Sequence, residues 1–203
     1  MGHSDDHPQE TRERIIYSAL EIFSEKGYDS SSVSEICKKA EITKGALYWH
    51  FKDKLDLYKE LIKLILEGII AVAHDLKNEA DSPLERFRIF NKNVLALIQG
   101  QDFYQKALLM FLRELRTDRI GELDQSLEIL SKRYDFGKII QDAIDAKELV
   151  DNLSSTEYIE LYKSIIGSLV INWLINGKKF DLCEKGERYF EHIFRLDLEK
   201  ERL

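Results

Sequence analysis

Apolar residues recur at three- and four-residue spacing through most of this chain, and little interrupts that pattern. Two prolines and ten glycines are spread over 203 residues. No long segment alternates apolar and polar residues in the manner of a strand. Because apolar residues at helical spacing line one face of an α-helix, the sequence predicts an all-α protein. Its 44% apolar content is sufficient to bury a large core.

Two short helices joined by a tight turn are expected early in the chain. Ser32 and Glu35 have the spacing of a capping box, so a helix should begin near Val33. After a turn at Glu41, Thr43 can cap a second helix. This second helix would bury Leu47 and Phe51 and would leave several large or charged side chains outside: Lys44, Tyr48, Trp49 and His50.

A recognition helix held through such a turn can enter the major groove of DNA. Gly45 would let the backbone near the helix start approach a phosphate closely. Residues 38–54 contain five lysines against Glu41 and Asp53, a local charge of +3 in a chain of net charge −7. The alternative is that the lysines form an ordinary solvated face and that the aromatic rings belong to a core, which is common for such a composition.

The order of the residues favours DNA binding over that alternative. The run TKGALYWHFKDK at residues 43–54 resembles the recognition-helix segment of TetR-family transcriptional regulators. Residues 11–28, TRERIIYSALEIFSEKGY, are similar to the first helix of that family, and Gly27 can close this helix. Glu41 departs from the resemblance, because such turns often carry glycine. A positive φ there would cost of order 1 kcal/mol, so a slightly remodelled turn is the other expectation.

The resemblance implies a helical DNA-binding head followed by a larger ligand-binding and dimerisation body. We expect a disordered tail over residues 1–8, the head over 9–54 and the body over 55–203. A long helix should reach about residue 78, and Ser82-Pro83 should start the next one. With about nine helices in total, the later ones are expected at 83–99, 103–115, 122–147, 155–176 and 181–198.

The expected DNA contacts divide into two groups. The residues expected to face bases are Thr43, Lys44, Ala46 and Trp49. The residues expected to hold phosphates are Ser32, Gly45, Tyr48, His50 and Lys54. A double-stranded DNA operator is therefore the expected partner.

Aromatic residues are concentrated in the expected body. An apolar effector cavity is one interpretation, and a plain core is the other. The candidate effector residues are His74, Phe87, Phe90, Phe103, Phe111, Tyr134, Tyr162 and Trp173. The resemblance implies that the last two long helices form a dimer interface, and the candidate interface residues are Leu161, Ile165, Ser168, Leu169, Asn172, Tyr189, Ile193 and Leu196. The alternative is that both stripes are internal.

The motifs of common enzymes are absent from the sequence. It has no glycine-rich phosphate loop, nucleophile elbow or paired-cysteine zinc spacing, so no catalytic residue, metal or cofactor is expected. Cys37 and Cys183 are expected to be buried free thiols. No leader or membrane-spanning run is recognised, so we expect a cytoplasmic protein with no membrane partner.

These expectations describe a ligand-responsive transcriptional regulator. It would act as a homodimeric repressor on a palindromic operator, and a small, largely apolar effector would release it. Two alternatives remain. One is an all-helical small-molecule binding protein that keeps the head only as a scaffold, and the other is an enzyme that processes a small molecule in the body.

Overall fold

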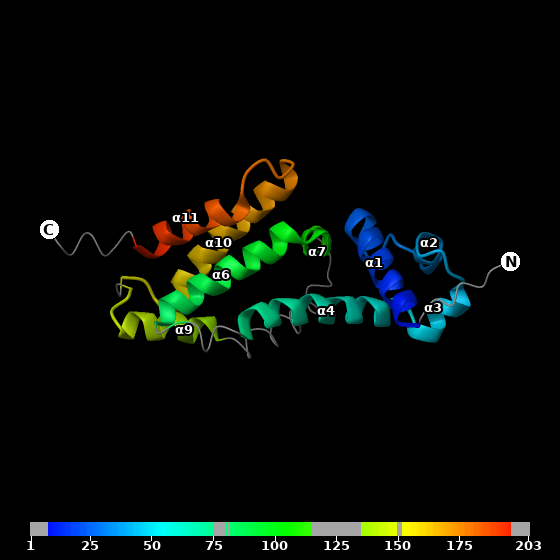
Figure 1. Ribbon diagram of the computed structural model, residues 1–203, viewed down its shortest axis with the longest axis horizontal. Coiled ribbons are helices and arrows are strands. Elements are labelled where there is room, and N and C mark those ends of the chain that lie inside the picture. Colours follow the sequence, from blue (N-terminus) through cyan, green and yellow to red (C-terminus); the bar gives the residue numbers. More distant parts are fainter. Residues whose placement is uncertain (1–7, 75–79, 81, 115–134, 150–151, 196–203) are drawn as a thin grey trace. The chain divides into compact units, whose positions relative to one another are not determined.

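The computed structural model describes residues 8–74, 80, 82–114, 135–149 and 152–195. All regular structure in these residues is helical, with nine α-helices and no strand, which confirms the expected all-α class (Figure 1). Residues 1–7 of the expected tail, the effector candidate Tyr134 and the interface candidate Leu196 lie outside the described residues. His74 is the last residue of a helix, and its side chain also lies outside the description.

The contacts divide the chain into two compact units, and the first contains the helices of the expected head. It comprises residues 1–67 and 102–127. Its described helices are α1 (Pro8–Lys26), α2 (Val33–Lys39), α3 (Lys44–His50), most of α4 (Lys54–His74) and α7 (Asp102–Glu114). α1 packs against both α2 and α7. Thus α7 belongs with the head by its contacts, and the expected boundary between residues 54 and 55 remains a prediction.

Local capping signals start the two short helices as expected. Ser32 accepts a hydrogen bond from the amide of Glu35 at 3.2 Å, and the Glu35 carboxylate accepts one from the amide of Ser32 at 2.9 Å. These two bonds confirm the capping box at the start of α2. Thr43 caps α3, because its hydroxyl oxygen accepts from the amide of Ala46 at 3.2 Å. Both signals act within four residues, so they are readable in the sequence.

The turn between α2 and α3 contains a glutamate in the left-handed region. Glu41 has φ of +56°. Its amide donates to Lys38 O at 3.4 Å, and the amide of Ile42 donates to Cys37 O at 3.0 Å. These bonds form the Schellman motif that commonly ends a helix, with glutamate where glycine is usual. Of the two expectations, the turn therefore keeps its geometry and Glu41 bears the cost. Gly27 closes α1 with φ of +81°, as predicted.

The second unit is a bundle whose centre is aromatic. It comprises residues 68–101 and 128–203, and its described helices are the end of α4, α6 (Pro83–Gly100), α9 (Phe136–Asp145), α10 (Ser155–Ile175) and α11 (Leu182–Arg195). α6 and α10 each pack against both α9 and α11, and Figure 1 shows α10 and α11 running side by side. The central rings belong to Phe87, Phe90, Phe136, Tyr158, Tyr162, Phe190 and Phe194.

The start of α6 is as expected, whereas a non-helical residue interrupts the helix expected over 122–147. Ser82 caps α6 by accepting from Glu85 N at 3.1 Å, and Pro83 occupies the first turn, as predicted. Inside the helix expected over 122–147, α9 begins at Phe136, and residues 122–134 lie outside the described residues. Asp135 is not helical, with ψ of 82°, and its side chain caps the new helix. A local hydrogen bond at Asp135 thus overrides the continuous apolar pattern.

α10 is long and apolar enough by composition to cross a membrane, with a mean hydropathy of 1.2 over its most apolar window. It nevertheless packs against α9 and α11 within the second unit. Its buried side chains are Tyr158, Ile166, Leu169, Val170 and Trp173. Only 28% of this apolar stretch is buried, and Leu161 and Ile175 are the large apolar side chains of α10 that are exposed.

Candidate nucleic-acid and effector sites

One side of α3 anchors this short helix in the core of the first unit. Leu47 is completely buried, and Phe51, at the C-terminal cap, is 3% exposed. The guanidinium of Arg12 in α1 lies 5.5 Å from the centre of the Phe51 ring. Because both anchors lie on one side, the opposite side of α3 is held outward, as the sequence predicts.

The outer side of α3 carries two large exposed aromatic residues. Tyr48 is 52% exposed and Trp49 is 72% exposed. The Trp49 ring meets the His50 ring nearly perpendicularly, with centroids 4.5 Å apart. Lys44 and Gly45 are exposed at the helix start, and Ala46 is half-buried. Tyr48 and Trp49 are neighbours on this side, and contiguous exposed apolar side chains mark an interaction surface, whereas single scattered ones do not.

The lysines of this region have different environments. Lys39 pairs with Glu21 at 2.7 Å. The ammonium of Lys54 donates to the carbonyls of Tyr28 at 2.7 Å and Ser31 at 2.8 Å. It also lies 4.1 Å from the centre of the Tyr28 ring. Lys54 therefore bonds within the head, and its expected contact with phosphate stays a prediction.

Three other lysines carry the outward charge. Lys38, Lys44 and Lys52 are exposed, and within the described part of the chain none of them has a carboxylate at ion-pair distance. Sequence reasoning counted Lys38 and Lys52 in the local charge but did not assign them to DNA. Only the fold separates them from Lys39 and Lys54, whose charges are used internally.

Ser32 and His50, two of the residues expected to hold phosphates, each interact with neighbouring side chains of the head. The hydroxyl of Ser32 accepts from the amide of Glu35 and donates to its carboxylate at 2.8 Å. The pKa of Glu35 is lowered to about 2 by the hydrogen bond from Lys26 and then by those from Ser32. The pKa of His50 is lowered by burial and then by the charge of Arg12, so its imidazole is neutral at pH 7. A neutral imidazole can still donate one N–H to a phosphate oxygen.

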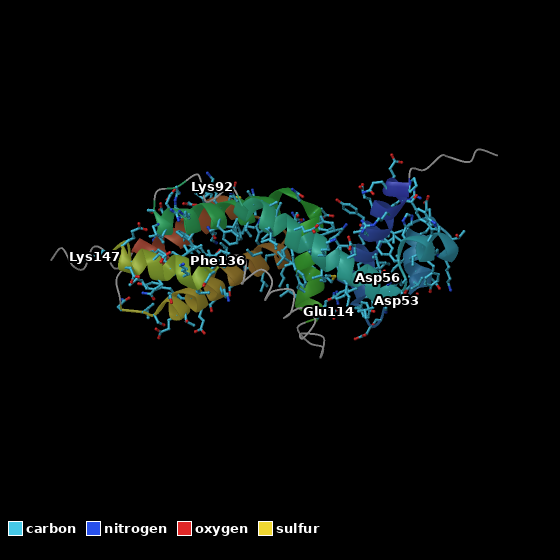
Figure 2. All side chains as sticks on the ribbon, turned by 90° about the horizontal axis from the view of Figure 1, so that it is seen from below. Asp53, Asp56, Lys92, Glu114, Phe136 and Lys147 are labelled. Carbon is cyan, nitrogen blue, oxygen red and sulfur yellow. The ribbon has the colours of Figure 1, made fainter. Side chains whose placement is uncertain are left out.

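The segment after α3 is braced by two aspartates at the start of α4. The amide of Asp56 donates to Asp53 Oδ1 at 2.8 Å, and the amide of Lys52 donates to Asp56 Oδ2 at 3.0 Å. Figure 2 labels both aspartates at this corner. These two hydrogen bonds fix the backbone of Lys52 next to the C-terminus of α3. The point from which the exposed lysine side chain extends is therefore defined.

The effector candidates separate into the two units. Phe87, Phe90 and Tyr162 belong to the aromatic centre of the second unit. Trp173 is 3% exposed in the same unit, and its indole N–H donates to Phe180 O at 2.9 Å. In contrast, Phe103 and Phe111 lie on α7 in the first unit. The Phe103 ring meets the ring of Tyr17 on α1, with centroids 5.3 Å apart. The fold therefore brings together only part of the candidate set.

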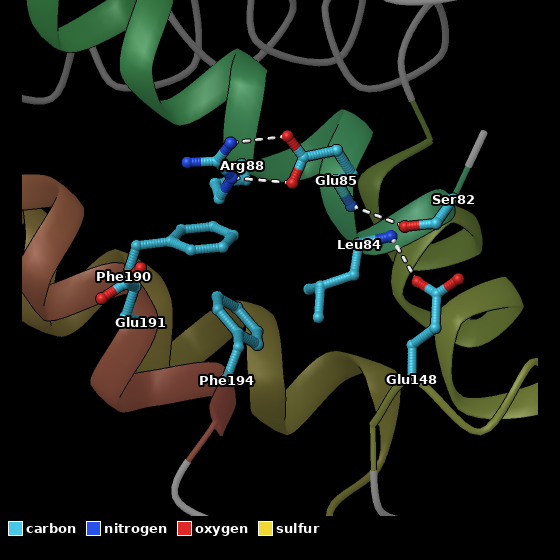
Figure 3. A pocket seen from close by; sticks show the side chains of 8 residues that line it. All are labelled: Ser82, Leu84, Glu85, Arg88, Glu148, Phe190, Glu191 and Phe194. Carbon is cyan, nitrogen blue, oxygen red and sulfur yellow. Dashed lines mark hydrogen bonds and ion pairs between the residues drawn. The ribbon is translucent and has the colours of Figure 1, made fainter. Parts of the chain in front are cut away.

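A pocket of about 310 Å³ opens at the N-terminal end of α6 in the second unit. Figure 3 shows Phe190 and Phe194 of α11 and Leu84 of α6 pointing toward the same space from different directions. Arg88 is held by Glu85 at 2.6 Å, and it also pairs with Glu187 at 2.5 Å. These bonds raise the pKa of Arg88. The pocket thus presents aromatic rings beside an arginine whose charge is already neutralised.

The described residues offer little basis for metal or thiol chemistry. Among the described residues, no group of three or more His, Cys, Asp or Glu side chains could hold a metal ion. Cys37 is buried and Cys183 is half-buried, and both are free thiols. Burial raises the pKa of each thiol. Higher thiol pKa values disfavour the reactive thiolate.

Comparisons with known proteins agree with the geometry of the head. Residues 15–61 match the model of the family described as bacterial regulatory proteins, tetR family. The chain is 29% identical over 196 residues to the HTH-type transcriptional regulator AcrR of Shigella flexneri, covering 94% of this chain and 90% of that protein. It is 27% identical over 205 residues to the HTH-type transcriptional repressor BepR of Brucella suis biovar 1 (strain 1330), covering 96% and 95%.

The fold as a whole is also similar to solved structures. One is the crystal structure of the transcriptional regulator FadR from Bacillus subtilis in complex with stearoyl-CoA. The TM-score is 0.72 at 25% identity, and the match covers 90% of this chain and 97% of that chain. The similarity therefore extends through both compact units and is not limited to the matched residues of the head.

Proposed function

We propose, on the premise that this chain belongs to the TetR family of transcriptional regulators, that it represses transcription as a homodimer on a palindromic operator. The chain is a ligand-responsive DNA-binding regulator. Repression, dimer symmetry and the nature of the effector are the parts that we add. With this role, the protein works in the cytoplasm and catalyses no reaction.

The observation that carries the proposal is the two-sided character of α3. Leu47 is buried, whereas Tyr48 and Trp49 are more than half exposed. A helix that projects large side chains from a rigid base is suited to the major groove. We assign base contacts to Thr43, Lys44, Ala46 and Trp49. We assign phosphate contacts to Ser32, Gly45, Tyr48, His50 and Lys54, and we add Lys38 and Lys52 because of their exposed charge.

The dimer interface is proposed on the outer faces of α10 and α11. A groove of about 410 Å³ there is lined by Leu161, Ile165, Tyr189 and Ile193 among others. These four residues belong to the predicted interface stripes. Ser168 and Asn172 are exposed on α10. Leu169 is only 5% exposed and packs in the core of the unit, so we leave it out of the proposed interface.

A second copy of the chain is the favoured occupant of this apolar face. α10 is apolar enough to span a membrane, yet its packing on α9 and α11 is that of a bundle helix. A helix pair with an apolar outer face buries it efficiently against the same pair in a two-fold partner. Replacing Leu161 and Ile193 by aspartate should then convert a dimer into a monomer in analytical ultracentrifugation.

The effector is proposed to enter the second unit. The aromatic centre is apolar, and a relative of known structure, FadR from Bacillus subtilis, holds stearoyl-CoA. A largely apolar molecule, free or attached to a polar carrier as in an acyl thioester, fits these observations. Two recognition helices of a dimer must lie about 34 to 36 Å apart to read successive major grooves. An effector that binds more tightly to a dimer with another separation would shift the population toward that state and so release DNA.

The decisive experiment is selection of bound duplexes from a random-sequence pool, followed by affinity measurements across a salt series. We expect a palindromic winner and a steep salt dependence. Tyr48→Ala should abolish enrichment, whereas Tyr17→Ala, which removes an exposed tyrosine of α1 instead, should not. Absence of any enriched duplex at low salt, with a folded and effector-free protein, would overturn the DNA-binding proposal.

A further inference from the structure

The aromatic centre of the second unit contains a fully buried amide. Asn91 on α6 is 0% exposed. The hydroxyl of Tyr162 on α10 donates to Asn91 Oδ1 at 3.0 Å. This bond directs the Asn91 Nδ2 group away from Tyr162. Within the described part of the chain, Nδ2 is buried and has no hydrogen-bond partner.

Such an arrangement costs stability that a hydrocarbon side chain would not cost. A buried donor without an acceptor loses its hydration and gains nothing in return. Leucine has the same number of side-chain heavy atoms as asparagine and carries no unpaired donor, although it would remove the acceptor of the Tyr162 hydroxyl. Orphaned buried donors are uncommon in folded proteins, and a functional role is one of the recognised reasons for them. We therefore interpret Asn91 Nδ2 as a hydrogen-bond donor whose acceptor is supplied by a bound ligand.

The surroundings of the amide define what can bring that acceptor. The Tyr162 ring lies 4.7 Å from the Phe87 ring, and Phe90 lies 4.6 Å from Phe136, measured between centroids. The hydrophobic side chains that pack around these rings are aromatic and aliphatic. Arg88, at the pocket lined by Phe190 and Phe194, already pairs with Glu85 and Glu187. Burial also raises the pKa of Tyr162, so its hydroxyl stays protonated and remains a donor to Asn91. An ionised ligand group would be desolvated here without a compensating cation.

We propose that Asn91 is the polar anchor of the effector site and that Nδ2 donates to a neutral carbonyl oxygen of the ligand. The hydrocarbon part of the ligand packs among the surrounding rings, and Tyr162 is a positioning residue that orients the amide. Esters, thioesters and ketones with a long apolar chain are the matching class. Ligand binding at Asn91 does not depend on the proposed function. Only the effect of that binding on DNA affinity rests on it.

The test compares probes that differ in the acceptor. The full-length protein is titrated with methyl decanoate carrying an isotopically labelled carbonyl, with tridecane of equal heavy-atom number, and with decanoate. Because the alkane leaves water more readily than the ester, the affinities are compared as an ester-to-alkane ratio. We expect this ratio to be about tenfold higher in the native protein than in Asn91→Leu, the effect of one net hydrogen bond. The infrared carbonyl stretch of the bound ester should lie below its frequency in an alkane solvent. Asn91→Leu should remove both the preference and the frequency shift.

The matched control is Asn93→Leu. Asn93 lies on the same helix, is half-buried, and its side chain reaches Val72 O at 3.4 Å instead of the ring cluster. This variant should keep the ester preference and the shift. Retention of both in Asn91→Leu would overturn the proposal. So would a bound carbonyl at the alkane-solvent frequency in the native protein, a result that decides the matter even if Asn91→Leu does not fold. Tighter binding of decanoate than of the ester would refute the neutral-acceptor assignment.

A DNA measurement keeps this proposal separate from the proposed function. If the ester binds through Asn91 but leaves operator affinity unchanged, the effector response is wrong and the site stands. If the ester releases DNA equally from the native protein and from Asn91→Leu, the response stands and the anchor is wrong.

Discussion

The backbone amide of Tyr28, just after α1, donates a 3.0 Å hydrogen bond to the carboxylate of Glu114 at the end of α7. Glu114 is 1% exposed, so this bond is shielded from water. Arg113 next to it donates to Ser24 O at 2.6 Å. α7 follows α6 directly in the chain, whereas its contacts are with α1. A segment that is covalently continuous with the second unit is thus bonded to the base of the DNA-binding head.

The first prediction concerns Glu114. Glu114→Leu removes a buried acceptor and should lower the free energy of unfolding by about 1–3 kcal/mol. Glu114→Gln keeps a carbonyl oxygen at the same place and should cost less. Urea denaturation followed by circular dichroism measures both. Equal losses in the two variants would show that the charge of Glu114, rather than its acceptor, supports Tyr28.

A second prediction follows from Glu21, which joins three helices. Its carboxylate on α1 pairs with Lys106 of α7 at 2.5 Å and with Lys39 of α2 at 2.7 Å. The hydrogen bonds from Lys106 and Lys39 lower the pKa of Glu21. The resulting stability is present above the ordinary glutamate pKa of about 4.3 and is lost as pH falls through the lower folded value.

Glu21→Gln should therefore destabilise the protein near pH 7, and the difference from the native protein should shrink below about pH 4. Thermal unfolding across a pH series measures this convergence. Glu25→Gln is the matched control, because Glu25 is exposed on the same helix and the described structure gives it no ion pair. A Glu21→Gln deficit that persists unchanged in acid would contradict the ion-pair explanation.

The third prediction uses the left-handed residue of the turn. Glu41→Gly should raise the free energy of unfolding by up to about 1 kcal/mol, because glycine adopts φ of +56° without steric cost. Glu41→Ala should give no such gain, because alanine keeps the Cβ that disfavours this conformation. Chemical denaturation measures the three proteins. A gain of the same size from alanine would mean that the charge of Glu41, not its backbone, is unfavourable.

The fourth prediction separates two roles of Lys54. Lys54→Ala should lower stability by about 1–3 kcal/mol, because two carbonyls lose a charged donor and the Tyr28 ring loses a cation. If Lys54 also holds a phosphate, operator affinity should fall for all sequences alike and the logarithmic salt slope should flatten by about 0.9.

Lys52→Ala provides the comparison for this prediction. Lys52 is exposed, so its removal should flatten the salt slope with little effect on stability. A less stable Lys54→Ala protein with the native salt slope would assign Lys54 to the architecture of the head alone. Unfolding curves and fluorescence anisotropy on one duplex distinguish these results.

The sequence is most informative where a few neighbouring residues decide the structure. The capping box of Ser32 and Glu35, the Thr43 cap and the Ser82-Pro83 helix start are all confirmed. Each depends on hydrogen bonds or fixed dihedrals within about one helical turn. The helix expected over 122–147 shows the limit of periodicity, because the non-helical Asp135 caps α9 inside an unbroken apolar pattern.

The candidate sites divide in the same way. The outward positions of Tyr48 and Trp49 follow from the inward packing of their neighbours, so the sequence could predict them. The use of Lys54 inside the head and the packing of Phe103 against Tyr17 within the first unit could not be predicted. Both depend on which segments, far apart in the chain, come into contact.

The sequence by itself determined the helical class, the caps of the recognition motif and the similarity of the head to the family model that it matches. These properties are encoded by local hydrogen bonding and by spacing along one helix. The tertiary structure alone decided that α7 bonds to α1, that Lys39 and Lys54 are occupied internally, and that Tyr162 turns the buried amide of Asn91. The physical reason is that burial and partner choice are properties of packed neighbours, and residues 71 positions apart become neighbours only after folding.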